Sequence, residues 1–120
     1  MKSSGSMLIS GDVVALDLGL PEGREAGVRH PAVVVTAQRI LDARPSVIHV
    51  VPVSTTDRGF ASEVTIEPDR DNGLRHQSVA QGQHIRAVST GRVDEVRGNV
   101  GPTVLGQIRD TLGLILDIPT

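Results

Sequence analysis

Two short segments of the chain combine a strongly β-forming apolar run with side chains that can bind an anion or move a proton. Arg29 and His30 stand directly before the run 31–35 (PAVVV), and a second run, 47–53, ends at the hydroxyl of Ser54. β-branched runs of this length predict buried strands. Two strands with such polar ends can bring a guanidinium, an imidazole and hydroxyls into one cleft. That combination suits a phosphate-bearing ligand.

Composition restricts the classes of protein to which the chain can belong. A chain of 120 residues is normally one domain with a single core. It has no cysteine, which excludes disulfides and thiolate metal sites and is typical of a reducing cytoplasm. No apolar stretch reaches the ~18 residues of a membrane span. The net charge of −2 gives no global basic field, so an anion site must be local. Phe60 is the only aromatic residue, so base recognition by stacking has almost no side chains available.

The pattern of apolar residues predicts a mainly β chain. Strands are expected within 8–18, 32–35, 47–53, 62–67, 77–87 and 94–100, with a helical turn within 36–44 and a turn at 68–73. Pro52 within its strand predicts an edge or a bulge, because proline cannot donate to the ladder. We expect residues 1–7 to be a flexible leader and residues 8–120 to form one domain.

One convincing helix is expected near the C-terminus. Gly101, Pro102 and Thr103 are a good start, because proline is tolerated in the first helical turn. An apolar stripe at helical spacing follows, made of Val104, Leu105, Ile108, Leu112, Ile115 and Leu116. Strands followed by one terminal helix predict an α+β fold, mainly β, in which a small bent sheet or barrel is capped by that helix.

The sequence offers no pattern typical of a metal or cofactor site. The four histidines (His30, His49, His76 and His84) lack metal-ligand spacing. Residues 69–73 superficially resemble a calcium loop, but Ala80 stands where the closing glutamate would be, so they are interpreted as a turn. We therefore expect no metal and no cofactor.

Several short motifs follow one another in a fixed order along the chain. They are 11–14 (GDVV), 23–27 (GREAG), 31–35 (PAVVV), 51–55 (VPVST), 58–60 (RGF) with 63–64 (EV), 84–86 (HIR) and 112–118 (LGLILDI). Each motif is weak alone, but their shared order and spacing resemble the MazF/PemK-type toxins of bacterial toxin–antitoxin pairs.

The resemblance implies a small SH3-like β-barrel capped by a C-terminal α-helix, usually a homodimer, in the cytoplasm. It also implies metal-independent, sequence-specific cleavage of single-stranded RNA, inhibited by a cognate MazE-like antitoxin. In such a reaction a base deprotonates the ribose 2′-OH, which attacks the adjacent phosphorus while an acid protonates the departing 5′ oxygen. The expected products are a 2′,3′-cyclic phosphate and a 5′-OH.

The resemblance also implies catalytic residues. A count without gaps places Glu25 on the family's loop glutamate, His30 on its catalytic arginine and Ser54 on its catalytic threonine, with Thr55 beside it. Arg29 then lies one residue before the position of the family's catalytic arginine. Either a one-residue bulge lets Arg29 bind the phosphate, or His30 takes over the acid/base role. Since adjacent strand residues face opposite ways, we expect one of these two side chains to point into the site.

Further cations are candidates for an RNA-binding surface. They are Arg24, Arg58, Arg75, His76, His84 and Arg86. A surface arginine is more often simply solvated, and only a phosphate contact changes the salt dependence of binding. Two other functions stay open, because fold does not fix function. One is a CcdB-like toxin that binds DNA gyrase and cleaves nothing, and the other is a catalytically inactive binding module.

Overall fold

The computed structural model describes residues 7–18 and 29–119. The strands are β1 (Asp12–Leu16), β2 (His30–Val34), β3 (Val47–Ser54), β4 (Glu63–Ile66), β5 (Ser78–Gln81), β6 (Arg86–Ser89) and β7 (Val93–Asn99). The helices are α1 (Gln38–Asp42) and α2 (Gly101–Ile115), with two 3₁₀ turns, η1 (Gly82–His84) and η2 (Thr90–Arg92). The expected strands, the short helical turn and the terminal helix are all present.

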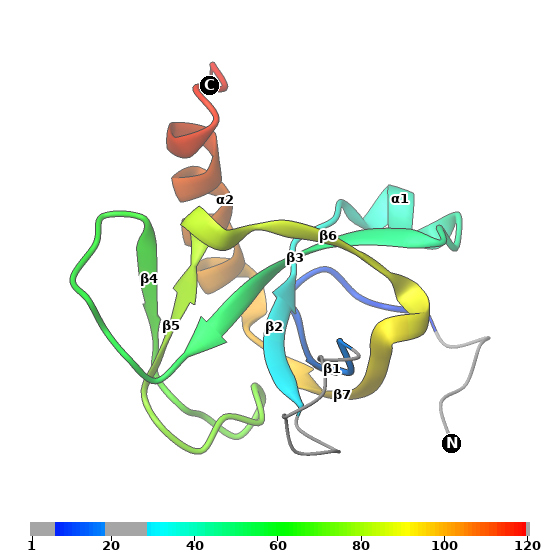
Figure 1. Cartoon of the computed structure of the whole chain (residues 1–120), viewed down its shortest axis with the longest axis horizontal. Coiled ribbons are helices and arrows are strands. Elements are labelled where there is room, and N and C mark those ends of the chain that lie inside the picture. Colours follow the sequence, from blue (N-terminus) through cyan, green and yellow to red (C-terminus); the bar gives the residue numbers. More distant parts are fainter. Residues whose placement is uncertain (1–6, 19–28, 120) are drawn as a thin grey trace.

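The strands form one strongly bent antiparallel sheet (Figure 1). Its order is β4-β5-β3-β2-β1-β7, and β6 pairs with β3 beside this path. Within the described residues the path ends at β4 and β7, so the barrel is open. The predicted class is confirmed: a mainly β fold with one long C-terminal helix.

The central strand β3 changes partners along its length. Residues 47–50 pair with β6, residues 50–52 pair with β2, and residues 53–54 pair with β5. Pro52 lies between the β6 and β5 pairings, where a missing N–H is tolerated. The expected edge or bulge is not found in the described pairings of β3, because the proline lies in a central strand at a gap between two partner strands. This change of partner turns the end of β3 away from β6.

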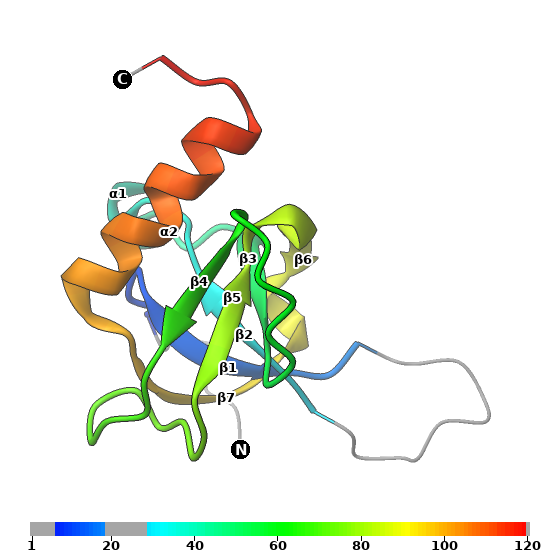
Figure 2. The same cartoon turned by 90° about the vertical axis from the view of Figure 1, so that its left-hand side faces the viewer.

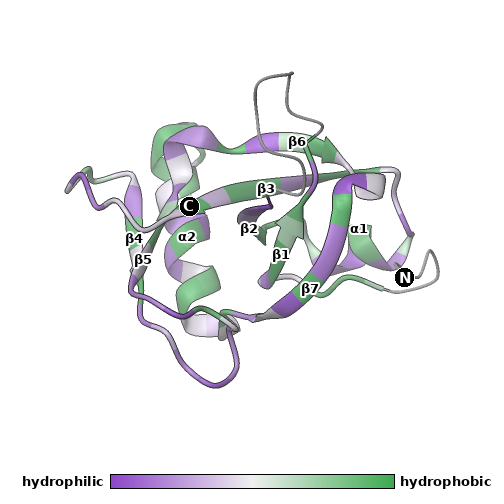
Figure 3. Ribbon diagram, turned by 60° about the horizontal axis from the view of Figure 1, so that its bottom comes forward, coloured by the Kyte–Doolittle hydropathy of each residue, from purple (hydrophilic) through white to green (hydrophobic). Residues whose placement is uncertain are grey.

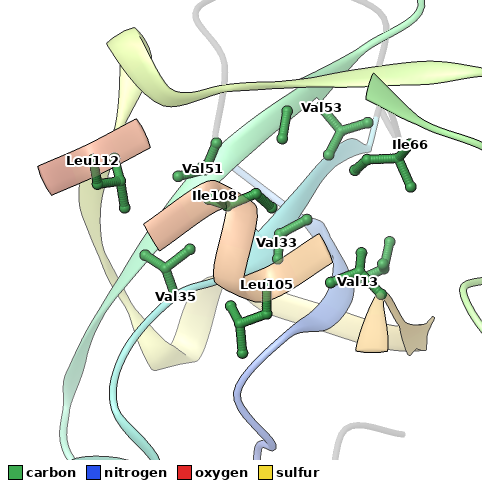
Figure 4. Packing of buried hydrophobic residues seen from close by; sticks show 11 residues of the cluster. Val13, Val33, Val35, Val51, Val53, Ile66, Leu105, Ile108 and Leu112 are labelled. Carbon is green, nitrogen blue, oxygen red and sulfur yellow. The ribbon is translucent and has the colours of Figure 1, made fainter. Parts of the chain in front are cut away.

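Two apolar clusters pack on the two faces of the bent sheet. Alternating residues of β2 serve both, because Val33 belongs to one cluster and Val34 to the other. The first cluster also contains Leu105, Ile108 and Leu112 of α2, which fill the space above β2 and β3 (Figure 4). These three helical residues are buried, so the predicted stripe is confirmed at its centre.

The last residues of that stripe lie differently. Ile115 is 41% exposed and Leu116 is 54% exposed, because the end of α2 projects beyond the sheet (Figure 2). The start of α2 agrees with the expectation, with Gly101 at φ +85° and Pro102 in the first turn. Neither helix of the described residues is long and apolar enough to cross a membrane.

Candidate functional site

A groove of about 950 Å³ opens where β2 begins and β3 ends, between β7 and the β4–β5 loop (residues 67–77). We call it the polar groove. Its lining residues are Pro31, Val53, Ser54, Thr55, Gly73, Leu74, Arg75, His76, Ser78, Glu95, Val96 and Arg97. Four strands, the β4–β5 loop and the first residue after β3 contribute to it, so it is assembled from segments far apart in the sequence.

Hydroxyl groups mark one wall of the polar groove. Ser54 is the last residue of β3, and its Oγ accepts a hydrogen bond from the Thr56 backbone N–H at 3.0 Å. This bond fixes the side chain at the strand end but leaves its O–H proton for another acceptor. Thr55 beside it is exposed. On β5, the Ser78 Oγ donates to the His76 carbonyl at 2.9 Å.

The β4–β5 loop is organised by one buried amide. Asn72 is 1% exposed, and its Oδ1 accepts from the backbone N–H groups of Asp69 at 3.2 Å and Leu74 at 3.0 Å. Its Nδ2 donates to the Glu67 carbonyl at 2.8 Å. Asp69 adds a turn of its own, because its Oδ1 accepts from the backbone N–H groups of Asp71 and Asn72, each at 2.8 Å. The predicted turn at 68–73 is therefore confirmed, and side-chain hydrogen bonds hold it together.

The same loop is docked against β7 through glycines. A Cβ on Gly73 would lie 2.5 Å from the Arg97 carbonyl oxygen, and one on Gly98 would lie 2.5 Å from the Asn72 carbonyl carbon. The Asn99 N–H donates to the Asp71 carbonyl at 2.8 Å across this contact. Because the two backbones touch, the loop cannot swing away from the strand without breaking that bond. The docked loop carries Arg75 and His76 on the wall of the polar groove.

The opposite wall is shaped by irregularities in β7. Its pairing with β1 shifts register twice, so that Arg97 falls between the paired residues Gly98 and Val96, and Asp94 between Glu95 and Val93. Such bulges redirect side chains. The Arg97 Nε donates to Glu95 Oε1 at 3.1 Å, and both residues line the groove. Figure 3 shows hydrophilic segments along β7 and on the β4–β5 loop.

Arg29 and His30 differ in their surroundings. The Arg29 Nε donates to the Asp94 Oδ2 in an ion pair with β7, and both side chains are partly exposed. The His30 imidazole is half-buried, and its Nε2 has no hydrogen-bond partner among the described residues. Strand alternation puts His30 on the face opposite to Pro31, which lines the polar groove, and Arg29 directly precedes β2. Neither Arg29 nor His30 itself is among the residues that line the groove.

Comparison with known proteins identifies the family to which the chain belongs. Residues 9–116 match the family described as PemK-like, MazF-like toxin of type II toxin-antitoxin system. The chain belongs to this family. The resemblance inferred from the motif order is thereby confirmed.

Individual members of the family are similar over nearly their whole length. The chain is 30% identical over 116 residues to endoribonuclease MazF9 of Mycobacterium tuberculosis, covering 93% of this chain and 98% of that protein. A MazE-MazF structure from Deinococcus radiodurans matches with a TM-score of 0.76 and 23% identity, covering 95% of this chain and 99% of the other. A mycobacterial endoribonuclease in complex with its cognate antitoxin matches with a TM-score of 0.74 and 18% identity, over 94% and 98% of the two chains.

The structure brings together only some of the residues that were predicted from the sequence to form a site. Four of them line the polar groove: Ser54, Thr55, Arg75 and His76. Three other cations lie elsewhere on the surface, Arg58 in the loop after β3, His84 in η1 and Arg86 on β6, and all three are exposed. Arg24 and Glu25 lie outside the described residues. Their roles, and those of Arg29 and His30, stay predictions.

Sequence reasoning missed three residues that shape the site. Asn72 and Gly73 were interpreted as turn residues that tolerate positive φ, and the buried side chain of Asn72 was not foreseen. Glu95 was interpreted as a charge that keeps a turn soluble, and Arg97 was not considered, because no local sequence pattern predicts the bulges in β7. Among the described residues, no three His, Asp or Glu side chains are grouped so as to hold a metal ion.

A second, smaller hollow of about 390 Å³ lies beside the C-terminal half of α2. We call it the apolar hollow. Its wall is mainly aliphatic and includes three side chains that can carry a charge, His49, Arg109 and Asp110. The other lining residues are Val35, Thr36, Ala37, Ile40, Ile85, Leu112, Gly113, Leu116 and Ile118. Arg109 ties this region together, because its Nη2 donates to the Val35 carbonyl at 3.2 Å and to the Thr36 carbonyl at 3.3 Å.

Proposed function

We propose that this MazF-family toxin is a sequence-specific, metal-independent endoribonuclease that cleaves single-stranded RNA. The observation that carries the proposal is the polar groove, in which the hydroxyls of Ser54 and Thr55 lie on the same hollow as Arg75, His76 and Arg97. A groove lined by hydroxyls and cations suits a phosphodiester backbone. The similarity to a named endoribonuclease at 30% identity supports the same activity.

The proposed chemistry needs no group beyond those of the protein and the RNA. A base removes the proton of the ribose 2′-OH, the 2′ oxygen forms a bond to phosphorus, and the bond from phosphorus to the 5′ oxygen breaks as an acid protonates that oxygen. The products are a 2′,3′-cyclic phosphate and a 5′-OH. Hydrogen bonds from Ser54 or Thr55 and the charge of nearby guanidinium groups stabilise the phosphoryl oxygens in the transition state.

We assign the charge-stabilising role to Arg29 in preference to His30. Arg29 forms an ion pair with β7, the strand that contributes Glu95 and Arg97 to the polar groove. His30 faces away from its neighbour Pro31, which lines the groove, and is half-buried. His30 as the acid/base group, with Glu25 as base or positioning residue, is the competing assignment within the same proposal.

Two partners besides RNA follow from the family. We propose that a cognate MazE-like antitoxin neutralises the toxin, and that the chain works in the cytoplasm as a homodimer. The exposed apolar side chains at the end of α2, next to the apolar hollow, favour that region for contact with a second copy. Ile40, Ile115, Leu116 and Ile118 are all at least 41% exposed there.

The test is cleavage of end-labelled RNA in EDTA by the wild type and by Arg29→Ala, His30→Ala and Ser54→Ala. We expect cyclic-phosphate and 5′-OH ends from the wild type and large losses in Arg29→Ala and Ser54→Ala. Unchanged cleavage rates in all three variants would show that these residues do not form the catalytic site. Inhibition of DNA gyrase without RNA cleavage would support the gyrase-binding alternative. No activity in either assay would support the inactive binding module.

A further inference from the structure

The polar groove contains a carboxylate, which a phosphodiester backbone alone does not require. Among the described residues that line the groove, Glu95 is the single acidic one, and its side chain is 59% exposed. RNA carries a negative charge on every phosphate, and a second negative charge nearby repels it. Glu95 is therefore unsuited to bind the RNA backbone, although it lies on the wall of the groove proposed to bind RNA.

Base selection in this groove depends mainly on hydrogen bonds. No Phe, Tyr or Trp is among its described lining residues, so a base can stack only on the His76 imidazole or on the guanidinium planes of Arg75 and Arg97. Stacking tolerates every base, so hydrogen bonds to base edges must determine which base is preferred. The hydroxyls and guanidinium groups can serve phosphates as well as bases. An ionised carboxylate only accepts hydrogen bonds, so its ligand is an N–H group on a base edge.

The structure of β7 places that carboxylate beside a guanidinium group. The Arg97 Nε lies 3.1 Å from Glu95 Oε1, in an ion pair between side chains that are 37% and 59% exposed. A carboxylate has about four acceptor positions, so it can bind Arg97 and two further N–H groups together. Val96, between the two charged residues, is 48% exposed and lines the same wall, where it can pack on a ribose or a base.

We propose that Glu95 is a specificity-determining residue that selects guanine in the bound RNA. The inference rests on the proposed function as an RNA-cleaving toxin and adds the base that the groove prefers. Guanine presents N1–H and N2–H side by side, which matches the two oxygens of a carboxylate. Adenine and cytosine offer one amino group next to an acceptor nitrogen, and the N3–H of uracil is flanked by two carbonyl oxygens.

The experiment measures binding separately from cleavage. Fluorescence anisotropy is recorded for oligouridine hexamers that carry one central guanosine or one central inosine, which lacks the N2 amino group. A 2′-O-methyl group on every ribose removes the nucleophile, so no strand is cut. The proteins are the wild type, Glu95→Gln, and Asp42→Asn as a control. Asp42→Asn removes the same charge on α1, outside the polar groove.

We expect the wild type and Asp42→Asn to bind the guanosine hexamer roughly tenfold more tightly than the inosine hexamer, as for a two-bond contact to a base. In Glu95→Gln the ratio falls to near one, because the amide turns a donor toward one of the guanine donors. A wild type that binds both hexamers equally overturns the proposal. The proposal is also overturned if Glu95→Gln binds both hexamers more tightly and keeps the wild-type ratio of the two affinities, because Glu95 is then only a solvated charge.

The outcomes also separate this inference from the proposed function. A wild type that prefers guanosine but leaves unmodified RNA intact contradicts the cleavage proposal and supports the role of Glu95. A wild type that cleaves unmodified RNA but shows no preference for guanosine supports the cleavage proposal and contradicts the role of Glu95. Failure to bind any of the hexamers overturns the role of Glu95, and the cleavage assay with unmodified RNA then decides on the proposed function by itself.

Discussion

The two hollows of this molecule differ in what their walls can bind. The polar groove exposes hydroxyls, cations and one carboxylate, and its walls come from a docked loop and a bulged strand. The apolar hollow is smaller and mainly aliphatic, and it lies beside the C-terminal half of α2. Under the proposed function, RNA binds in the polar groove and a second copy of the chain contacts the apolar hollow. One small domain can therefore offer two chemically different surfaces.

The largest effect is expected from Ser54→Ala in the polar groove. Loss of one hydrogen bond to the transition state should lower kcat/KM for RNA cleavage by roughly a hundredfold. The melting temperature should stay within the error of the wild type, because Ser54 is only half-buried. The control is Thr65→Ala, an exposed hydroxyl on β4 outside the groove. Equal cleavage by both variants would exclude Ser54 from the reaction.

A second large effect is expected from Asn72→Ala, which tests whether the groove depends on its docked loop. The substitution leaves three backbone groups without their amide partner and should lower the free energy of unfolding by about 2 kcal/mol. RNA cleavage should fall in parallel, because Arg75 and His76 lose their support. Chemical denaturation and cleavage assays measure the two effects. Gln77→Ala, in an exposed residue of the same loop, should stay within about 0.5 kcal/mol of the wild type.

A tenfold effect is expected at the apolar hollow. Leu116→Lys places a charge on its wall and should raise the dissociation constant of the homodimer by roughly tenfold or more. Leu114→Lys is the matched control, because Leu114 is 82% exposed and does not line the hollow. Light scattering over a dilution series measures both. If the two variants dissociate alike, the dimer contact lies elsewhere.

The smallest effect is expected from Arg75→Ala. An arginine that contacts a phosphate contributes about one unit to the slope of log affinity against log salt concentration, so the variant should lose about that much. Arg58→Ala should keep the wild-type slope, since Arg58 lies outside the polar groove. The same slope in both variants would mean that the loop cation is merely solvated.

The sequence predicted the elements better than their relative positions. The β-branched runs at 31–35 and 47–53 and the stripe of α2 are local patterns, and each formed the expected element. Ser54 was identified because it ends such a run. The register shifts of β7 depend on its pairing with β1 more than 75 residues away, and no short window contains that information. Glu95 and Arg97 were missed for this reason.

Arg75 and His76 illustrate an intermediate case. They were proposed as RNA-binding residues from charge alone, in the same group as Arg58, His84 and Arg86. Only the burial of Asn72 and the contact of Gly98 with the loop distinguish the two that reach the groove from the three that do not. Both facts depend on tertiary packing, which a single sequence does not reveal.

The irregular register of β7 has a further consequence for how this chain behaves in a crowded cell. Within the described residues β7 ends the sheet, and a regular outer strand offers a template on which another molecule can add its own strand and start a fibre. Two bulges and three charged residues, Asp94, Glu95 and Arg97, make β7 a poor template. The same distortions that shape the wall of the polar groove therefore disfavour aggregation through this strand.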